Sequence, residues 1–274
     1  MLTRFAPAPT GWLHLGHVLN AEYVWGAGAK IHLRIEDHDR ERCRPEYEAG
    51  ILADLDWLGY RAHFPLVRQS ERTSVYLEAA EVLRSSELLY ACDCTRKQVD
   101  ERTSGFERRT SGRLISDAPP RTPELRYDNY CRDRGLPITE GVGWRVRIDP
   151  GVETFIDRGL GAQEQDPALQ CGDLLIRDRL GNWTYQLAAT VDDYRQGIDL
   201  VIRGEDLLES TGRQIRLARL LGRETPATFL HHSLLMKSPG QKLSKSDGDT
   251  GIRELRARGW TPEQVKRAAR GSVR

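Results

Sequence analysis

Long hydrophobic runs are missing from this 274-residue chain. No apolar stretch is long enough to cross a bilayer, so we expect no membrane association. The first residues do not form a basic segment followed by an apolar one, which argues against a secretory signal peptide. Only five cysteines are present, and without a secretion signal they fit a reducing compartment better than a disulfide framework. We therefore expect a cytoplasmic protein.

An excess of one charge is also absent. The 41 Lys and Arg residues nearly balance the 40 Asp and Glu residues, leaving a formal net charge of +1. A protein that grips a long nucleic acid is often more basic, so the overall charge does not indicate RNA binding. Basic residues gather near the end of the chain. They are explained equally well by a surface that binds phosphates and by an ordinary solvated helix face. These basic residues are Arg216, Arg219, Arg223, Arg253, Arg256, Arg258, Lys266, Arg267, Arg270 and Arg274.

What is present is a pair of short motifs far apart in the chain. The first, His14-Leu15-Gly16-His17, opens a predicted helix after a Pro/Gly-rich loop. A helix start attracts phosphate, and two imidazoles there can stabilise charge on an attacked phosphate. Gly16 would let a purine lie against the backbone. Taken alone, this motif is better explained as a helix cap.

The second motif is Lys242-Leu243-Ser244-Lys245-Ser246, which follows a predicted turn. Its two lysines suit a polyphosphate that gains charge and then leaves, although most Lys/Ser stretches are solvated loops. In this order, the two motifs resemble the signature sequences of class I aminoacyl-tRNA synthetases. Leu15 and Leu243 stand where Ile and Met are usual, and both exchanges conserve volume.

Further segments resemble the glutamyl/glutaminyl branch of that class and extend the likeness from the first residues to about Ser246. They are Arg4-Phe5-Ala6-Pro7-Ala8-Pro9-Thr10-Gly11, Leu33-Arg34-Ile35-Glu36-Asp37, Tyr185-Gln186-Leu187-Ala188, Val191-Asp192-Asp193 and Ile202-Arg203-Gly204-Glu205-Asp206. Glutamyl-tRNA synthetases continue into anticodon-binding domains, which we do not expect here. In that respect the chain resembles the short glutamyl-queuosine tRNA(Asp) synthetase family.

The periodicity predicts an α/β fold with a Rossmann-type, doubly wound parallel sheet. We expect strands at residues 3–6 and 30–35, and helices at 16–29, 45–58 and about 70–84. Ligands bind such sheets beyond the carboxyl ends of the strands. The first motif, Glu36 and Arg203 all lie at predicted strand ends.

An insert is expected to split this sheet, because residues 95–126 are polar and show no clear periodicity; we expect them to be partly mobile. Strand patterns return at 143–149 and 174–176, and a hairpin turn at 180–182 precedes 183–187. A helix is expected at about 207–221, and Thr261-Pro262-Glu263-Gln264 has the pattern of a capping box. The predicted parts are the first half of the catalytic domain (1–89), an insert with a zinc site (90–134), the second half (135–232), and the lysine loop with a small C-terminal helical region (233–274).

The resemblance implies a reaction in which a carboxylate attacks the α-phosphate of ATP and expels pyrophosphate. His14 and His17 would stabilise the α-phosphate, while Lys242 and Lys245 would hold the leaving pyrophosphate. Mg²⁺ would accompany ATP rather than occupy a dedicated protein site. The residues assigned to ATP binding are His14, Gly16, His17 and Lys245.

The same resemblance implies a pocket for L-glutamate. Arg4 and Arg203 suit its side-chain carboxylate, because a planar guanidinium binds a carboxylate in a bidentate manner. Glu36 would hold the ammonium, and Tyr185 would donate a hydrogen bond or pack nearby. Each residue alone has an ordinary structural explanation. The remaining residues assigned to this pocket are Phe5, Ala6, Pro7 and Ala8, of which Ala8 replaces a Ser common in glutamyl enzymes.

Cys92-Asp93-Cys94, followed by Tyr127 and Cys131, resembles the zinc motif of the short family. Three thiolates and a phenolate would complete one tetrahedral structural site. Tyr130 and Asp128 are alternative fourth ligands, and three unrelated buried thiols are a further explanation.

The resemblance thus implies a ligase that makes glutamyl-adenylate and esterifies queuosine at the wobble position of tRNA(Asp). It would act as a monomer and bind the anticodon stem-loop. Nothing in the residues themselves reads queuosine. The alternatives are a compact glutamyl-tRNA synthetase that charges the tRNA 3′ end, a catalytically silent paralogue that binds RNA or protein, and a nucleotidyltransferase for another carboxylate.

Overall fold

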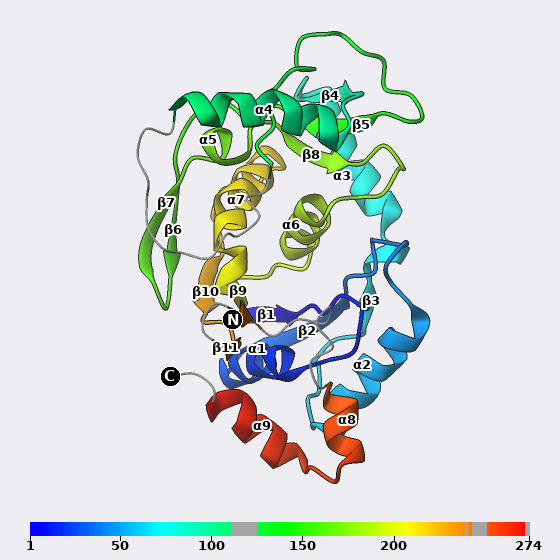
Figure 1. Ribbon diagram of the computed structural model, residues 1–274, viewed down its shortest axis with the longest axis vertical. Coiled ribbons are helices and arrows are strands. Elements are labelled where there is room, and N and C mark those ends of the chain that lie inside the picture. Colours follow the sequence, from blue (N-terminus) through cyan, green and yellow to red (C-terminus); the bar gives the residue numbers. More distant parts are fainter. Residues whose placement is uncertain (111–124, 239–240, 243–250, 272–274) are drawn as a thin grey trace.

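A parallel sheet forms the first part of the fold in the computed structural model, which describes residues 1–110, 125–238, 241–242 and 251–271 (Figure 1). Its strands are β1 (Leu2–Phe5), β2 (Lys30–Ile35) and β3 (Val67–Arg68), in the order β1-β2-β3. Helices α1 (Leu15–Gly26) and α2 (Pro45–Trp57) connect them. Pro45 occupies the first turn of α2, as predicted, because a helix start needs no N–H there.

The second half of the fold continues this arrangement with strands in the order β7-β6-β10-β9. The strand β10 runs parallel to both β9 and β6, while β7 is antiparallel to β6. The backbone N–H of Asp199 donates to the carbonyl of Leu2 at 3.1 Å, so β9 adjoins β1. The elements are β6 (Glu153–Asp157), β7 (Gly161–Gln165), α6 (Tyr185–Arg195), β9 (Leu200–Gly204), α7 (Thr211–Leu220) and β10 (Thr228–His232).

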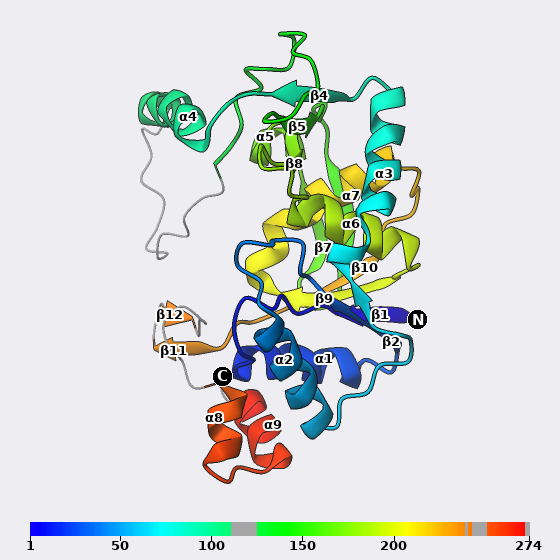
Figure 2. The same cartoon turned by 90° about the vertical axis from the view of Figure 1, so that its right-hand side faces the viewer.

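Helices cover both faces of the parallel strands. Figures 1 and 2 show α1 and α2 on one face, and α6 and α7 on the other. Buried apolar side chains fill both interfaces, among them Val24 and Ile35 on one side and Val201 and Ile215 on the other. The predicted doubly wound α/β fold is confirmed.

A separate antiparallel sheet lies at the end of the molecule that α4 covers (Figure 2). It has the order β4-β5-β8 and joins strand β4 to two later strands. The strand β5, which we expected in the second half of the catalytic domain, thus pairs with β4 from the insert. The residue boundaries of the four parts stay a prediction. The elements here are α3 (Thr73–Ser85), β4 (Leu89–Cys92), α4 (Arg96–Thr110), β5 (Gly143–Val146), α5 (Pro167–Cys171) and β8 (Leu174–Arg177).

The expectation of a segment without periodic structure from residue 95 onward was wrong for α4. Thr95 and Gln98 form a reciprocal cap: the Gln98 N–H donates to Thr95 Oγ1 at 3.2 Å, and the Thr95 N–H donates to Gln98 Oε1 at 2.8 Å. This Thr-x-x-Gln pattern was present in the sequence and marks a helix start. Val99 then anchors the helix by being buried against the cysteine cluster. Residues 111–124 of the predicted mobile insert lie outside the described residues.

Two other predicted elements differ in detail. The turn before Trp183 is present, because the Asp178 carboxylate accepts the N–H groups of Leu180 and Asn182. Pairing after it is limited to one bridge between Arg177 and Trp183, and α6 begins at Tyr185. The helix expected from residue 207 begins as the 3-10 helix η2 (Glu205–Ser210) and becomes α-helical at Thr211.

The C-terminal helices α8 (Ile252–Ala257) and α9 (Pro262–Gly271) pack beneath α1 and α2 (Figure 2). Thr261 and Gln264 form the predicted capping box, and buried Val265 and Ala269 fix α9 against α1. Several basic side chains named from sequence have a partner within the protein, although Arg219, Arg253, Arg256 and Arg270 stay exposed. The pairs are Arg253 over Trp12, Arg256 over Trp57, Lys266 over Tyr60, Arg270 with Glu22, and Arg216 and Arg219 with Glu153. Within the described ranges, every helix is too short or too polar to traverse a bilayer.

Candidate active site

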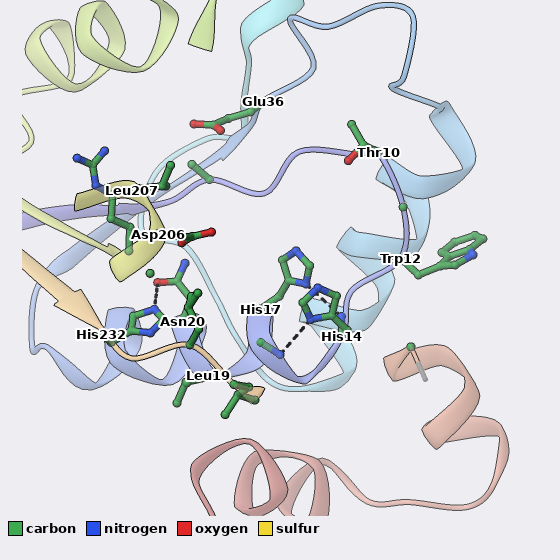
Figure 3. A pocket seen from close by; sticks show the side chains of 18 of the residues that line it. Thr10, Trp12, His14, His17, Leu19, Asn20, Glu36, Asp206, Leu207 and His232 are labelled. Carbon is green, nitrogen blue, oxygen red and sulfur yellow. Dashed lines mark hydrogen bonds between the residues drawn. The ribbon is translucent and has the colours of Figure 1, made fainter. Parts of the chain in front are cut away.

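A cavity of about 1090 Å³ opens beyond the carboxyl ends of β1, β2, β9 and β10 (Figure 3). Each strand places a lining residue at its end, namely Ala6, Glu36, Gly204 and His232. The cavity therefore lies where a doubly wound sheet binds its ligands. Of the residues named from sequence, Arg4, Ala6, His14, Gly16, His17, Glu36, Tyr185 and Arg203 line it.

His14 and His17 cap α1 and face the cavity at the same time. His14 Nδ1 accepts the N–H of Gly16, and His17 Nδ1 accepts the N–H of His14, both at 3.1 Å. A ring nitrogen that accepts carries no proton, so each neutral imidazole carries its N–H on Nε2. The cap and the phosphate-binding hypothesis are thus compatible. At Gly16, a Cβ would come within 2.9 Å of the His14 ring, so a side chain at this position would displace the ring that caps α1.

Arg203 is 3% exposed and is held by neutral groups. Its guanidinium donates to Tyr185 Oη (3.3 Å), Gln214 Oε1 (2.7 Å), Thr211 Oγ1 (2.8 Å) and His231 Nε2 (3.0 Å). Among the described residues, no carboxylate lies within 4.0 Å of it. Burial accordingly lowers the pKa of Arg203. A buried cation without an anionic partner beside a cavity is suited to an anionic ligand.

Arg4, by contrast, has a protein anion. Its Nε lies 3.2 Å from the Asp193 carboxylate, and its Nη1 donates to the carbonyl of Ile202. Burial alone would raise the pKa of Asp193, but Arg4 and the fully buried Arg34 hold it below its usual range. Asp193 therefore stays ionised and fixes the two guanidiniums.

Glu36 projects into the cavity from the end of β2 (Figure 3). Burial raises the pKa of its carboxyl, although Arg34, at 3.7 Å, opposes this shift. Its backbone N–H donates to the carbonyl of Pro7 at 3.1 Å, which ties the first loop to the strand end. Glu36 thus lines the same cavity as the cationic Arg203 and adds an acidic group to it.

The other residues named from sequence lie elsewhere. Phe5 belongs to the core and packs edge-on against Trp25, and neither it nor Pro7 or Ala8 lines the cavity. Lys242 lies on β12 (Gln241–Lys242), which pairs with β11 (Met236–Ser238) directly after β10. Lys245 lies outside the described residues.

The chain on both sides of the second motif nevertheless reaches the cavity. Leu235 precedes it and Gly251 follows it, and both line the cavity. Gly251 forms a bridge with His14, and the N–H of Ile252 donates to the carbonyl of Leu13 at 2.8 Å. The lysine segment is therefore attached at its far end to the first motif.

Further lining residues were not assigned to the site from sequence, among them Asn20, His232 and Asp206. Asn20 lies one turn after His17 on α1, and its Oδ1 is 3.2 Å from His232 Nε2. The His232 ring stacks on Tyr23 with a centroid distance of 4.8 Å. Helical spacing from His17 would have indicated Asn20, and Asp206 on η2 ends the Ile202–Asp206 segment that resembles the glutamyl/glutaminyl branch.

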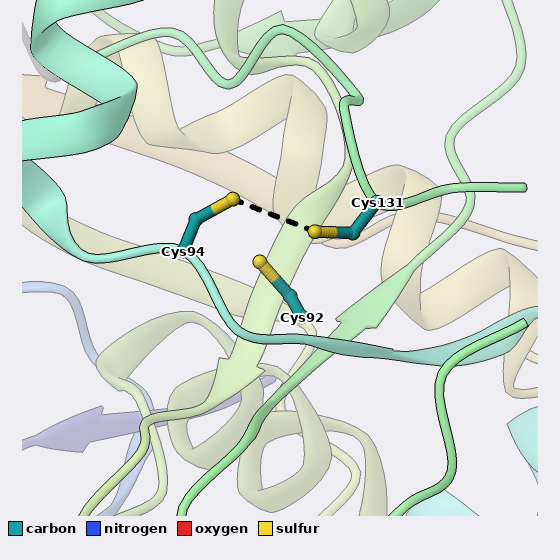
Figure 4. A group of neighbouring side chains, drawn as sticks. All are labelled: Cys92, Cys94 and Cys131. Atoms are coloured by element: carbon teal, nitrogen blue, oxygen red, sulfur yellow. Dashed lines mark hydrogen bonds between the residues drawn. The ribbon is translucent and has the colours of Figure 1, made fainter. Parts of the chain in front are cut away.

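The three cysteines predicted to bind zinc lie side by side in a separate cluster (Figure 4). None of them lines the cavity. The sulfurs of Cys92, Cys94 and Cys131 are all within 4.8 Å of one another. Tyr127 Oη lies 3.4 Å from the sulfur of Cys92 and 4.0 Å from that of Cys94. Three soft sulfur donors and one phenol oxygen at these distances can bind a metal ion such as zinc.

The alternative fourth ligands are engaged elsewhere. Tyr130 is 54% exposed, with the guanidiniums of Arg102 and Arg134 over its ring. Asp128 forms an ion pair with Arg102. Tyr127 is therefore the oxygen ligand that best fits the geometry.

Comparison with known proteins decides the family. The model of the catalytic domain of class I (E and Q) tRNA synthetases matches residues 1–270. The chain belongs to this family. The resemblance inferred from the two motifs is thereby confirmed.

Several relatives and solved structures are similar over most of the chain. The glutamyl-Q tRNA(Asp) synthetase of Rhodobacter capsulatus is 35% identical over 97% of this chain and 99% of that protein. That of Burkholderia cenocepacia is 40% identical over 91% and 81%. The solved glutamate tRNA ligase from Elizabethkingia meningosepticum superimposes with a TM-score of 0.71 at 28% identity, covering 96% of this chain but 59% of that one.

Proposed function

We propose that this protein activates L-glutamate with ATP and transfers the glutamyl group to queuosine at the wobble position of tRNA(Asp). The observation that carries the amino-acid half is Arg203, a buried cation with neutral partners beside a cavity. A substrate carboxylate would supply the missing anion and form a charge-assisted hydrogen bond. Glu36, which lines the same cavity, would hold the ammonium.

In the activation step, the α-carboxylate of glutamate attacks the α-phosphorus of ATP, and the bond to the bridging oxygen of pyrophosphate breaks. His14 and His17 would each direct an Nε2–H at the phosphate as negative charge develops there. Lys242 and Lys245 would hold the leaving pyrophosphate, and Mg²⁺ would arrive with ATP. Gly16, with no side chain, leaves room for the nucleotide beside the motif.

The acceptor half rests on similarity to relatives named for glutamyl-Q tRNA(Asp). In the transfer step, a hydroxyl of queuosine attacks the activated carbonyl and AMP leaves. We propose that the anticodon stem-loop enters by the open side of the cavity and that the protein acts as a cytoplasmic monomer. Charging of the tRNA 3′ end is the second candidate, because glutamate--tRNA ligase 2 of Methylorubrum populi is 38% identical over 98% of this chain and 59% of that protein.

We also propose one structural zinc ion bound by Cys92, Cys94, Tyr127 and Cys131. It would fix the loop that follows β4 to the segment that carries Tyr127. Guanidiniums of Arg145, Arg102 and Arg134 each donate to one of the three sulfurs at 3.3–3.4 Å. These cations would offset the negative charge of the thiolates.

The proposed function is tested in two stages. Pyrophosphate exchange should occur with ATP when glutamate is the only amino acid supplied. Absence of exchange would favour a binding protein. Labelled glutamate should then reach tRNA(Asp) that carries queuosine but not the same tRNA without it. Transfer to unmodified tRNA(Glu) would instead establish the second candidate.

A further inference from the structure

The histidine that contacts Arg203 is itself held by a buried carboxylate. His231 Nδ1 lies 2.6 Å from Asp157 Oδ2, and both side chains are fully buried. Asp157 also accepts the backbone N–H groups of Gly159 and Leu160 at 2.9 Å. Burial would raise the pKa of Asp157, but its hydrogen bonds from His231 and from the backbone hold that pKa below its usual range.

These contacts determine the tautomer of His231. An ionised carboxylate only accepts, so Nδ1 must carry the proton that points at Asp157. Burial, together with the nearby Arg203, lowers the pKa of His231 to about 4, so the ring is neutral at physiological pH. Its Nε2 therefore has a lone pair, which accepts the Nε–H of Arg203 at 3.0 Å.

We propose that Asp157 and His231 position Arg203 for the substrate carboxylate without neutralising its charge. The statement rests on the proposed function, because it concerns the same glutamate pocket. A carboxylate in direct contact with Arg203 would pair with it, as Asp193 pairs with Arg4, and would compete with the substrate. The imidazole instead separates the two charges, orienting the guanidinium through a neutral acceptor.

The remaining contacts of Arg203 fit this role. Gln214 and Thr211 on α7 and Tyr185 on α6 accept from Nη1 and Nη2, so the guanidinium is fixed along both edges. Of its five N–H groups, those four bonds leave one Nη2–H with no partner among the described residues. This hydrogen and the uncancelled charge are what a ligand carboxylate requires. A neutral amide, as in glutamine, would satisfy the hydrogen bond but not the charge.

Three variants test the proposal. In Asp157→Asn, the amide can donate to Nδ1, which would move the ring proton to Nε2. The Nε2–H would then point at the Nε–H of Arg203, and the hydrogen bond between the two residues would be lost. His231→Leu removes the acceptor, whereas His231→Gln keeps one. Asp166→Asn is the matched control, since Asp166 also binds backbone N–H groups but caps α5.

Two measurements are made on the folded, purified protein. The ¹⁵N shifts of the His231 ring should report the Nδ1–H tautomer in the wild type. In pyrophosphate exchange, Asp157→Asn and His231→Leu should raise the KM for glutamate about tenfold or more and leave that for ATP within about twofold. His231→Gln should recover most of this loss. Across the variants, the preference for glutamate over glutamine should fall as the KM for glutamate rises.

The outcomes separate the inference from the proposed function. An Nε2–H tautomer or an imidazolium at neutral pH would overturn the inference whether or not the protein exchanges pyrophosphate. So would unchanged glutamate KM values in both disrupting variants, or equal rises in the Asp166→Asn control. A wild type with the expected tautomer that exchanges no pyrophosphate with glutamate would count against the proposed function alone.

Discussion

Replacing Arg203 is the most direct perturbation of the glutamate pocket. Arg203→Met removes the charge while keeping an unbranched side chain, and Arg203→Lys keeps the charge. A lysine ammonium has three donors at one point, so it cannot reach the four acceptors on β10, α6 and α7 that the guanidinium contacts. We therefore expect the affinity for glutamate to fall in the order wild type, Arg203→Lys, Arg203→Met.

The magnitude follows from the environment of the charge. Losing one hydrogen bond to a charged group costs about 1.5–3 kcal/mol, and a full charge pair at about 4 Å near a protein surface is worth about 4 kcal/mol. The KM for glutamate in Arg203→Met should therefore rise between about tenfold and about a thousandfold. Arg203→Lys should lie near the lower limit.

Steady-state pyrophosphate exchange measures this effect, with glutamate varied at saturating ATP and ATP varied at saturating glutamate. Thermal unfolding establishes that each variant is folded. Arg216→Met is the matched control, because Arg216 lies on the same helix as Gln214 and pairs with Glu153 instead of facing the cavity. If Arg203→Met kept the wild-type KM for glutamate, Arg203 would not be the residue that binds the substrate carboxylate.

Three further predictions concern other parts of the molecule. His17→Ala should lower kcat for exchange by about two to three powers of ten while changing the glutamate KM little, and a change confined to KM would contradict its role in charge stabilisation. Burial raises the pKa of Asp54 from 3.8 to about 6, so its ionisation destabilises the fold increasingly as the pH rises from 3.8 to 6. Asp54→Asn should match the wild type in denaturant unfolding below pH 3.8 and exceed it by about 1–3 kcal/mol at pH 8; a variant less stable at pH 8 would refute this. Cys94→Ser and Tyr127→Phe should each reduce the zinc content of the purified protein, measured by elemental analysis, and wild-type protein without zinc would contradict the site.

Local sequence rules were sufficient for much of the secondary structure. The strand at Lys30–Ile35 has the predicted bounds, Pro45 begins α2, and Thr261 caps α9. Each of these features depends on residues a few positions apart. The same kind of rule marks the start of α4, because Thr95 and Gln98 form a capping pattern within an otherwise polar segment.

The two motifs and the cysteine spacing were also readable without a structure, and they indicated the family. What the spacing left open was the fourth ligand beside the three cysteines. The resemblance favoured Tyr127, with Tyr130 and Asp128 as alternatives, and only folding buries the Tyr127 ring and exposes that of Tyr130. The sequence likewise showed that the first motif begins a helix at His14. It did not show the bridge from His14 to Gly251, because that bridge joins segments more than two hundred residues apart.

The environment of Arg203 was decided by tertiary structure alone. Its partners come from α6, α7 and β10, and Asp157 behind His231 comes from β6. The sequence contains these groups, but it does not show which neutral groups contact Arg203, nor that its contacts among the described residues include no carboxylate. Charge compensation in a buried site depends on distances between side chains, and those distances are fixed only when the strands and helices pack together.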